Sequence, residues 1–265
     1  MKVVSYNLRK NRAVTEIGAL AEDHGADVLC LQEAEAVALP ARLGHMALVH
    51  ATARNRLGLA MYVREERFRT RTASTFQLKK SLHDRLLAPA HERLLGARLH
   101  DLETERDFVV ASFHAAPLTA LNSLRRHQIH AALGELRLLG PGLPALMVGD
   151  YNYPVFKGRL DTEMRDHGYE LSLSDKRTYT RYKMFRGHFD FATSVGLDIG
   201  GVQTLGRGLS DHLPILVSAS LRPEALEVAP ASGVPVLAGE APGVPLGVNA
   251  AAEGVSGPGR AIVAA

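Results

Sequence analysis

Short apolar runs that end in polar side chains constrain the fold of this chain more than any other feature. Carboxylates, amides and imidazoles at the ends of buried strands cost free energy unless they are paired or bind a ligand. Their recurrence therefore predicts one shared site, built where several strands end. Five polar breaks follow or lie between such strand-like runs: Asn7, Glu33, His114, the pair Asp150/Asn152 and the dipeptide Asp211-His212.

The order of the expected elements predicts an α/β fold with mixed sheets. A strand over residues 2–8, an amphipathic helix over 14–24 and a strand over 26–32 have the order and length of a βαβ unit. One such unit beside several hairpins favours an α/β sandwich over a purely parallel sheet. The segments typical of antiparallel strands are residues 46–51, 58–64, 68–78, 94–102 and 108–113.

The second half of the chain continues this alternation. Residues 121–139 have the spacing of a long helix that packs on a sheet, and residues 145–148 form an apolar strand. A loop-rich segment is expected over 153–187. Further strands are expected over residues 189–194, 203–205 and 215–221. Glycine-rich phosphate-binding patterns do not follow any expected strand, which disfavours a nucleotide-cradling loop.

The composition changes at Pro223 and divides the chain in two. We expect a globular domain over 1–221 and a flexible tail, rich in Ala, Pro, Gly and Val, over 222–265. The tail also fits a partner-binding segment. Cys30 is the single cysteine and lies in an apolar run, so we expect a buried thiol and no internal disulfide.

The formal net charge of +3 is compatible with a polyanionic substrate such as nucleic acid but is too small to require one, and a solvated basic surface is the simpler interpretation. The N-terminus lacks the apolar stretch of a signal peptide, and no apolar run reaches the ~18 residues of a membrane span. We therefore expect a cytoplasmic protein without a membrane span.

Five short motifs resemble, in their order and spread, those of the endonuclease/exonuclease/phosphatase superfamily. They are Ser5-Tyr6-Asn7-Leu8, Leu31-Gln32-Glu33, Gly149-Asp150-Tyr151-Asn152, Phe189-Asp190-Phe191 and Ser210-Asp211-His212. The resemblance implies a deoxyribonuclease-I-like fold, which is a four-layer α/β/β/α sandwich of two mixed sheets packed face to face. It also implies divalent-metal hydrolysis of phosphate esters at one edge between the sheets.

Oxygen ligands such as carboxylates and amides suit Mg²⁺ or Mn²⁺. The resemblance implies that Asn7 and Glu33 are metal ligands and that Asp211 is a third ligand, direct or through water. Taken singly, Glu33 also fits a helix N-cap or a surface ion pair, and Asn7 also fits a turn residue.

The same resemblance implies catalytic roles for the remaining motif residues. Asp150 orients or deprotonates the attacking water, and Asn152 hydrogen-bonds the phosphate, although Gly-Asp-x-Asn is also typical of an Asx-turn. His212 is the acid/base or the transition-state cation, and Asp190 holds its ring. His114 matches a second histidine of the deoxyribonuclease-like branch, and a hydrogen-bonded loop histidine is its structural alternative.

Substrate contacts are expected from Arg93, Arg181 and Tyr182, the last two within an Arg/Tyr-rich segment over 176–188 that also fits a solvated loop. The chain has no Trp and carries His114 where the abasic-site endonucleases place a tyrosine, so abasic-site specificity is disfavoured. The first functional hypothesis is a nuclease. The second is a phosphatase or phosphodiesterase for a small molecule or lipid headgroup, and the third is a non-catalytic binding module.

Overall fold

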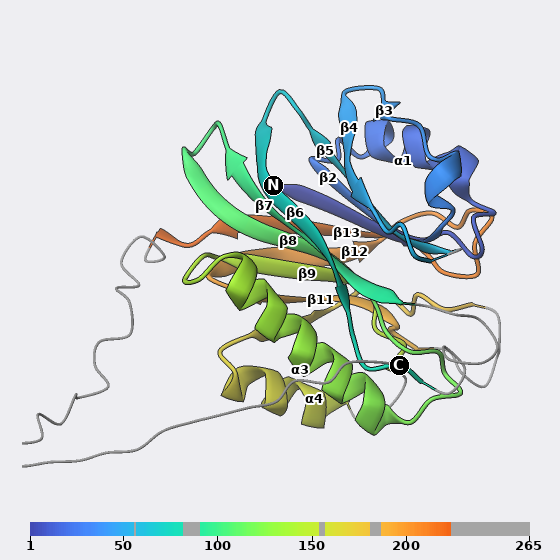
Figure 1. Ribbon diagram of the computed structural model, residues 1–265, viewed down its shortest axis with the longest axis vertical. Helices are drawn as coiled ribbons and strands as arrows, with labels where there is room; N and C mark the ends of the chain where they lie inside the picture. Colours follow the sequence, from blue (N-terminus) through green and yellow to red (C-terminus); the bar gives the residue numbers. More distant parts are fainter. Residues whose placement is uncertain (56, 82–90, 154–156, 181–186, 224–265) are drawn as a thin grey trace, which may run out of the picture. The chain divides into compact units, whose positions relative to one another are not determined.

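Two mixed β-sheets pack face to face, with helices on their outer faces (Figure 1). The computed structural model describes residues 1–223 except 56, 82–90, 154–156 and 181–186. This arrangement confirms the predicted α/β/β/α sandwich. The predicted tail lies outside the described residues from 224 onwards, as do Arg181 and Tyr182. Among the helices of the described part, none is both long and apolar enough to cross a membrane.

The first sheet is built around the parallel pair of β1 (Lys2–Asn7) and β2 (Val28–Ala34). Between them the chain forms a 3₁₀ turn (Val14–Glu16) and the helix α1 (Ile17–Asp23), so the predicted helix is α-helical only over its second part. The other strands join antiparallel, and the order is β12 (Leu197–Thr204), β13 (Ile215–Leu221), β1, β2, β5 (Gly58–Arg64), β4 (Met46–Ala51) and β3 (Arg42–Leu43).

The second sheet repeats this plan with the parallel pair β8 (Arg106–His114) and β9 (Ala145–Asp150), joined by α3 (Asn122–Leu139). Its order is β10 (Glu170–Leu173), β11 (Asp190–Val195), β9, β8, β7 (Glu92–Asp101) and β6 (Phe68–Gln77).

Two sequence expectations were wrong. The segment expected to be loop-rich contains β10 and the helix α4 (Lys157–Asp166), in which Leu160 and Met164 are the buried residues, a weaker apolar pattern than that of α3. β12 is longer than expected because this strand at the edge of the sheet continues through an irregularity between Ile199 and Gly201, where glycines weaken the pattern.

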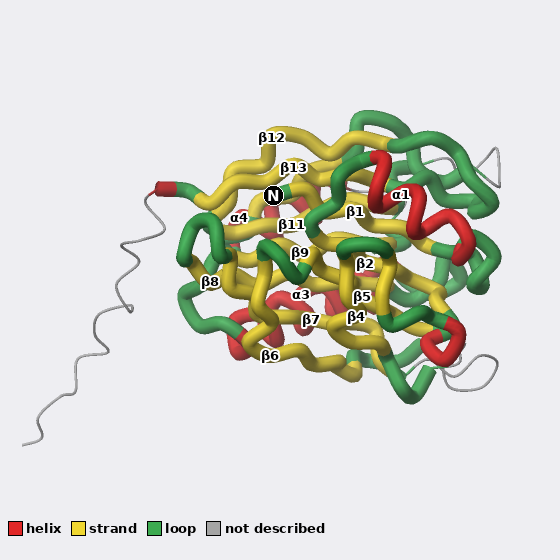
Figure 2. Tube along the Cα trace, turned by 90° about the horizontal axis from the view of Figure 1, so that it is seen from above, coloured by secondary structure: helices red, strands yellow, loops and turns green. Residues whose placement is uncertain are grey.

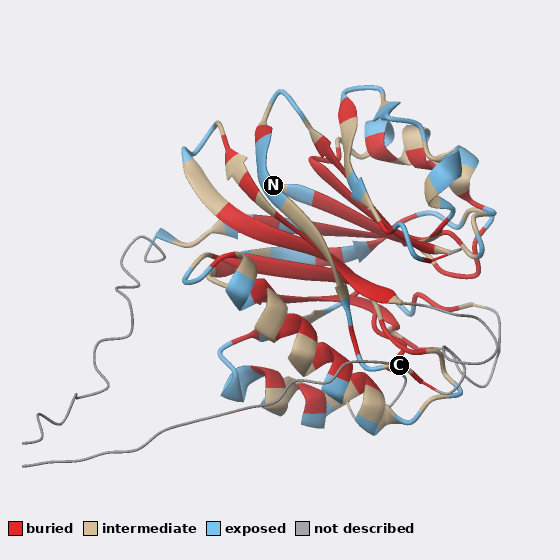
Figure 3. Ribbon diagram, viewed as in Figure 1, coloured by how far each residue is buried: buried red, intermediate tan, exposed pale blue. Residues whose placement is uncertain are grey.

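Three apolar layers result from strict alternation along the strands. In β1, Val3 packs between the sheets, whereas Val4 and Tyr6 pack toward α1. A third layer lies between the second sheet and its helices (Figure 3). Cys30 is buried between the sheets, as expected, and burial raises the pKa of its thiol.

The loops lie at the two ends of the strands, and the predicted site residues lie at one of these ends (Figure 2). In the second sheet, Asp150 is the direct register partner of both His114 and Asp190. In the first sheet, Asn7 ends β1 beside the end of β2, and β13 begins next to β1 at Ile215. The topology thus places polar residues from both sheets at one end of the sandwich.

Candidate active site

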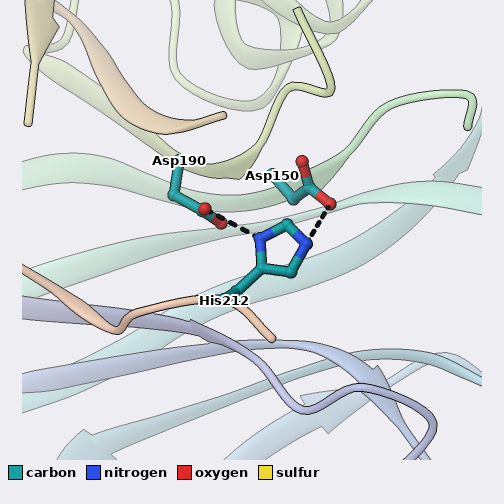
Figure 4. Close-up of side chains that lie close together, drawn as sticks. All are labelled: Asp150, Asp190 and His212. Atoms are coloured by element: carbon teal, nitrogen blue, oxygen red, sulfur yellow. Dashed lines mark hydrogen bonds and ion pairs between the residues drawn. The ribbon is translucent and has the colours of Figure 1, made fainter. Parts of the chain in front are cut away.

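A buried chain of three ionisable groups forms the centre of the site (Figure 4). The Nδ1 atom of His212 lies 2.8 Å from Asp190 Oδ2, and its Nε2 atom lies 3.8 Å from Asp150 Oδ2. One possible ligand atom from each residue lies within 4.8 Å of the others. Asp150 and Asp190 come from neighbouring strands of the second sheet, whereas His212 comes from the loop that leads into β13 of the first. The structure thus brings three of the predicted catalytic residues together.

Burial and neighbouring charges together shift the pKa values of His212 and Asp150. Burial alone lowers the pKa of His212, but Asp190 and Asp150 outweigh it and raise the pKa to about 10. Burial is the largest influence on Asp150 and raises its pKa to about 7. The His212 cation opposes this rise, and the nearby Asp190 and Glu33 carboxylates add to it. Asp190 therefore holds an imidazolium, and Asp150 can exchange a proton near neutral pH.

Glu33, Asn7 and His114 form a second group that touches the first through Asp150. The Nδ2 atom of Asn7 lies 3.0 Å from Asp150 Oδ2 and 3.5 Å from Glu33 Oε1. The Nε2 atom of His114 lies 3.6 Å from Asp150 Oδ2 and 4.0 Å from Glu33 Oε1. Burial, with the Arg93 and His212 cations, holds the pKa of His114 well below its ordinary value. His114 is therefore a neutral imidazole beside two carboxylates.

A β-bulge aims Glu33 at this group. The pairing of β2 with β5 shifts between Gln32 and Ala34, and Glu33 has φ of 54°. A bulge breaks the alternation of a strand and re-aims one side chain, a feature that recurs next to active sites. The backbone N–H of Lys10 donates to Glu33 Oε2 at 2.7 Å and fixes the carboxylate from the opposite side.

The turn after β9 orients Asp150. Its Oδ1 atom accepts the backbone N–H of Asn152 at 2.9 Å, and its Oδ2 atom accepts from Asn152 Nδ2 at 3.1 Å. The predicted Asx-turn is therefore present and also holds both predicted site residues. Gly149 precedes them with φ of 146°, and a Cβ atom there would meet the carbonyl oxygen of Phe113 at 2.0 Å, so this position requires glycine.

Asp211 and Arg93 contact partners outside the group of Asp150, Asp190 and His212. Asp211 Oδ2 forms an ion pair with Arg9 Nε at 3.5 Å. The buried guanidinium of Arg93 donates from Nη1 to the carbonyl oxygens of His114 and Ala115, both at 2.9 Å. Arg93 thereby holds the strand end that carries His114. The metal role of Asp211 and the substrate role of Arg93 stay predictions.

A family model described as the Endonuclease/Exonuclease/phosphatase family matches residues 4–212. The chain belongs to this family. Its members are phosphoester hydrolases. None of the curated protein sequences matches the chain.

Solved structures agree with this fold at low sequence identity. The mannosyl-6-phosphatase Bt3783 of Bacteroides thetaiotaomicron is 17% identical, with a TM-score of 0.65 over 83% of this chain and 100% of that chain. The catalytic domain of human Nocturnin with bound sulfate is 16% identical, with a TM-score of 0.66 over 84% and 94%. D. rerio TDP2 with a single-strand DNA product is 14% identical, with a TM-score of 0.66 over 83% and 98%.

The donor set of this family member fits a hard divalent cation. Oxygen atoms of Glu33 and Asp150 approach the same two nitrogen atoms, of Asn7 and His114, and the group holds more carboxylates than cations. In the structure, Oδ1 of Asn7 accepts the backbone N–H of Arg9 at 2.9 Å, so its NH₂ group faces the carboxylates. A half-turn of this amide would present its oxygen to a cation there. Such oxygen-rich sets suit Mg²⁺ or Mn²⁺ better than Zn²⁺.

Sequence reasoning missed the residues that hold the His212 loop. Ser210 Oγ donates to the carbonyl oxygen of Asn7 at 2.6 Å and accepts the backbone N–H of His212 at 3.1 Å. Glu16 accepts from Tyr6 Oη at 2.9 Å and from the backbone N–H of Leu209 at 2.8 Å. The motif around Asp211-His212 includes Ser210 and could have indicated it. Glu16 contacts a loop far along the chain, for which its own neighbourhood holds no signal.

A buried polar layer between the sheets was also missed. Gln32 Nε2 donates to Ser112 Oγ at 2.9 Å and to Ser5 Oγ at 3.1 Å. Gln32 lies directly before the predicted site residue Glu33, whereas Ser112 and Ser5 lie two positions before His114 and Asn7. Because fully satisfied buried networks rigidify their surroundings, this layer ties the two halves of the site to each other.

Proposed function

We propose that this protein is a divalent-metal-dependent phosphodiesterase that hydrolyses nucleic acid. The observation that carries the proposal is the contact between two groups at Asp150. On one side lies the buried Asp190–His212 pair, suited to acid/base work. On the other lie Glu33 and Asn7, whose oxygen atoms suit a hard cation. Phosphate ester hydrolysis needs both kinds of group at one reacting centre.

The roles follow from the directions of the contacts. Asp190 engages Nδ1 of His212, which leaves the Nε2–H of the imidazolium directed toward Asp150 and the space where a phosphate would lie. His212 then donates a hydrogen bond to the phosphoryl oxygen on which charge develops. Asp150, with its raised pKa, takes the proton of the attacking water. Glu33 and Asn7 would hold the cation, which would neutralise charge on the phosphate oxygens.

A basic turn beside the site favours nucleic acid over small substrates. Arg9, Lys10 and Arg12 lie two to five positions after Asn7, and the last two side chains are exposed. Three cations within four residues provide attraction for the successive phosphates of a polyanion. A phosphatase for a sugar or other small-molecule phosphate is the second candidate, because the chain matches the mannosyl-6-phosphatase Bt3783 over the whole length of that protein.

The test is hydrolysis of labelled single- and double-stranded DNA and RNA beside bis-p-nitrophenyl phosphate and p-nitrophenyl phosphate. Each reaction is run with Mg²⁺, Mn²⁺ or EDTA. His212→Ala is compared with His100→Ala, since His100 Nδ1 also pairs with a carboxylate, Asp107, at 2.7 Å but at the other end of β7.

Metal-dependent polymer cleavage that is lost in His212→Ala and kept in His100→Ala supports the proposal. Activity confined to the small esters would favour the second candidate. Absence of hydrolysis with every substrate and both metals, in a folded protein, would contradict both.

A further inference from the structure

We propose that Thr178 is a positioning residue that aligns Asp190 with His212. The kinetic part of this inference rests on the proposed function, whereas its structural part does not. Thr178 is fully buried and lies on the segment that connects β10 to β11. It contacts the backbone on both sides of the Asp190–His212 hydrogen bond, and it does so through different atoms.

The hydroxyl oxygen of Thr178 holds the Asp190 side. Thr178 Oγ1 accepts the backbone N–H groups of Phe189 and Asp190, both at 3.1 Å. Asp190 is the first residue of β11, so its peptide group lies at the strand end, where the backbone is held less firmly than within the sheet. The two hydrogen bonds therefore fix the position of the Cα atom from which the carboxylate extends.

The main chain of the same segment holds the His212 side. The carbonyl oxygen of Thr178 accepts the backbone N–H of Leu213 at 2.8 Å, and Tyr179 forms a β-bridge with His212. The carbonyl oxygen of Asp211 accepts from the backbone N–H of Thr180 at 2.9 Å and from its hydroxyl at 3.0 Å. The ring of Tyr179 packs on the His212 ring at a centroid distance of 4.9 Å.

This bridge matters because the two catalytic partners belong to different sheets. Asp190 extends from β11 of the second sheet, and the His212 loop leads into β13 of the first. A hydrogen bond of 2.8 Å between side chains of two sheets requires that the backbones keep their separation closely. Thr178 supplies a direct connection of that kind, since one residue bonds to Asp190 and to the residue after His212.

The chain offers a matched control in Thr193. It is also fully buried, lies on β11 three residues after Asp190, and its hydroxyl exchanges a 3.0 Å hydrogen bond with Tyr151 Oη. Thr178→Val and Thr193→Val each replace a buried hydroxyl by a methyl group of similar size. Thr178→Ser keeps the acceptor oxygen, and Thr178→Ala removes it, so this second pair isolates the hydroxyl if the valine variant does not fold.

Two readouts separate positioning from general stability. The first is the ring N–H proton spectrum of the metal-free protein. Signals lost in His212→Ala belong to the His212 ring, and the one that is also lost in Asp190→Asn identifies the Nδ1–H that Asp190 accepts. The second is kcat and KM for bis-p-nitrophenyl phosphate, with thermal unfolding measured on every variant. The proton spectrum needs no substrate, so it tests the role of Thr178 even if the wild-type protein hydrolyses none of the substrates. Absence of hydrolysis would count against the proposed function and not against the positioning role.

We expect Thr178→Val to weaken or shift the Nδ1–H signal and to lower kcat by about 10- to 100-fold with little change in KM. Thr178→Ser restores both, whereas Thr178→Ala does not, and Thr193→Val lowers the unfolding temperature without moving the signal. An unchanged His212 signal in Thr178→Val and Thr178→Ala would overturn the proposal. Equal losses of kcat in Thr178→Val and Thr193→Val would overturn it as well.

Discussion

The two ends of the sandwich both bury charged side chains, but they balance their charges differently. At the end opposite the candidate site, which we call the distal end, Arg67 forms ion pairs with Asp27 at 3.0 Å, Asp101 at 3.1 Å and Glu103 at 3.0 Å. Arg64 adds a further pair to Asp27 at 3.4 Å. Each buried carboxylate there has a guanidinium partner, which is what burial of charge requires.

At the catalytic end the carboxylates outnumber the cations in contact with them. Asp150, Asp190 and Glu33 surround one imidazolium, His212, and the neutral ring of His114. Repulsion between these carboxylates is part of the reason that the pKa of Asp150 is raised. The distal end thus satisfies its own charges, whereas the catalytic end leaves negative charge that a bound cation can neutralise.

The backbone shows the same difference. Six residues other than glycine have positive φ in the described part of the chain, and the distal hairpin contains one of them, Glu105. The other five lie beside the candidate site: Arg9, Lys10, Asn11, Glu33 and Asn152. Such conformations cost about 1–3 kcal/mol each and cluster at functional sites. Substitutions at the catalytic end should therefore change mainly activity, whereas substitutions at the distal end should change mainly stability.

The largest expected effect is on turnover at the catalytic end. His212→Ala should lower kcat about 10²- to 10⁴-fold, because the proposed donor to the phosphoryl oxygen is lost. The protein should remain folded, since hydrogen bonds from Ser210 to Asn7 and from Thr180 to Asp211 hold the His212 loop without the imidazole. Steady-state kinetics and circular dichroism check this. An unfolded variant would assign His212 a structural role instead.

The reverse pattern is expected at the distal end. Arg67→Met should lower the free energy of unfolding by about 3–5 kcal/mol, because Asp27 and Asp101 remain buried without their principal partner. The kcat of the folded fraction should stay within about twofold, since the cluster lies at the far ends of β1 and β7. Urea denaturation and kinetics well below the midpoint test this. A loss of kcat as large as that in His212→Ala would erase the distinction between the ends.

Metal binding should stabilise the protein through the catalytic end alone. Mn²⁺ at 100 times its dissociation constant should raise the free energy of unfolding by about 2.7 kcal/mol, because it binds the folded site. Glu33→Gln should shift this response to higher Mn²⁺, whereas Glu103→Gln at the distal end should leave it unchanged. Thermal unfolding against Mn²⁺ concentration is the measurement. Identical curves for Glu33→Gln and wild type would remove Glu33 from the ligand set.

A smaller effect is expected in the pH dependence of stability without metal. The pKa of Asp150 in the fold is about 7, above its ordinary value of 3.8, so the folded protein holds a proton that the unfolded chain has released. Its contribution is complete below pH 3.8 and is lost as the pH rises toward 7. Asp150→Asn should therefore remove part of the decline between these values. Urea midpoints at several pH values, as differences from wild type, provide the check, and parallel curves would contradict it.

Much of the catalytic end could be predicted from the sequence because its residues end strands. Buried strands are visible as apolar runs, and the parallel pairs β1/β2 and β8/β9 carry their last residues to one edge of the sandwich. Asn7, His114 and Asp150 each end such a strand, so their meeting follows from topology. His212 required its motif, because it lies in a loop whose course depends on contacts with Tyr6, Asn7 and Glu16.

The rest depends on contacts between distant segments. Thr178 contacts residues up to 35 positions away through one hydroxyl and one carbonyl group, and the sequence around Thr178 does not indicate these contacts. The Arg67 cluster joins residues near positions 27 and 101, whose proximity appears only once both sheets have formed. Spacing along the chain reports which face a residue occupies, whereas these pairings depend on how two sheets stack.

The smallest effect is expected from deleting residues 224–265. Arg222 lies just past β13, where Nη2 pairs with Glu170 Oε1 and Nε with Asp198 Oδ1, both at 2.7 Å. The deletion keeps these exposed pairs, which are worth about 0–1 kcal/mol each. Because β13 begins near the site at Ile215 and ends at the distal end, the cut lies far from His212.

We expect kcat within about twofold of wild type and a free energy of unfolding within about 0.5 kcal/mol. A large loss of stability with unchanged kcat would mean that these residues pack on the domain, and a loss of kcat alone would assign them to substrate binding.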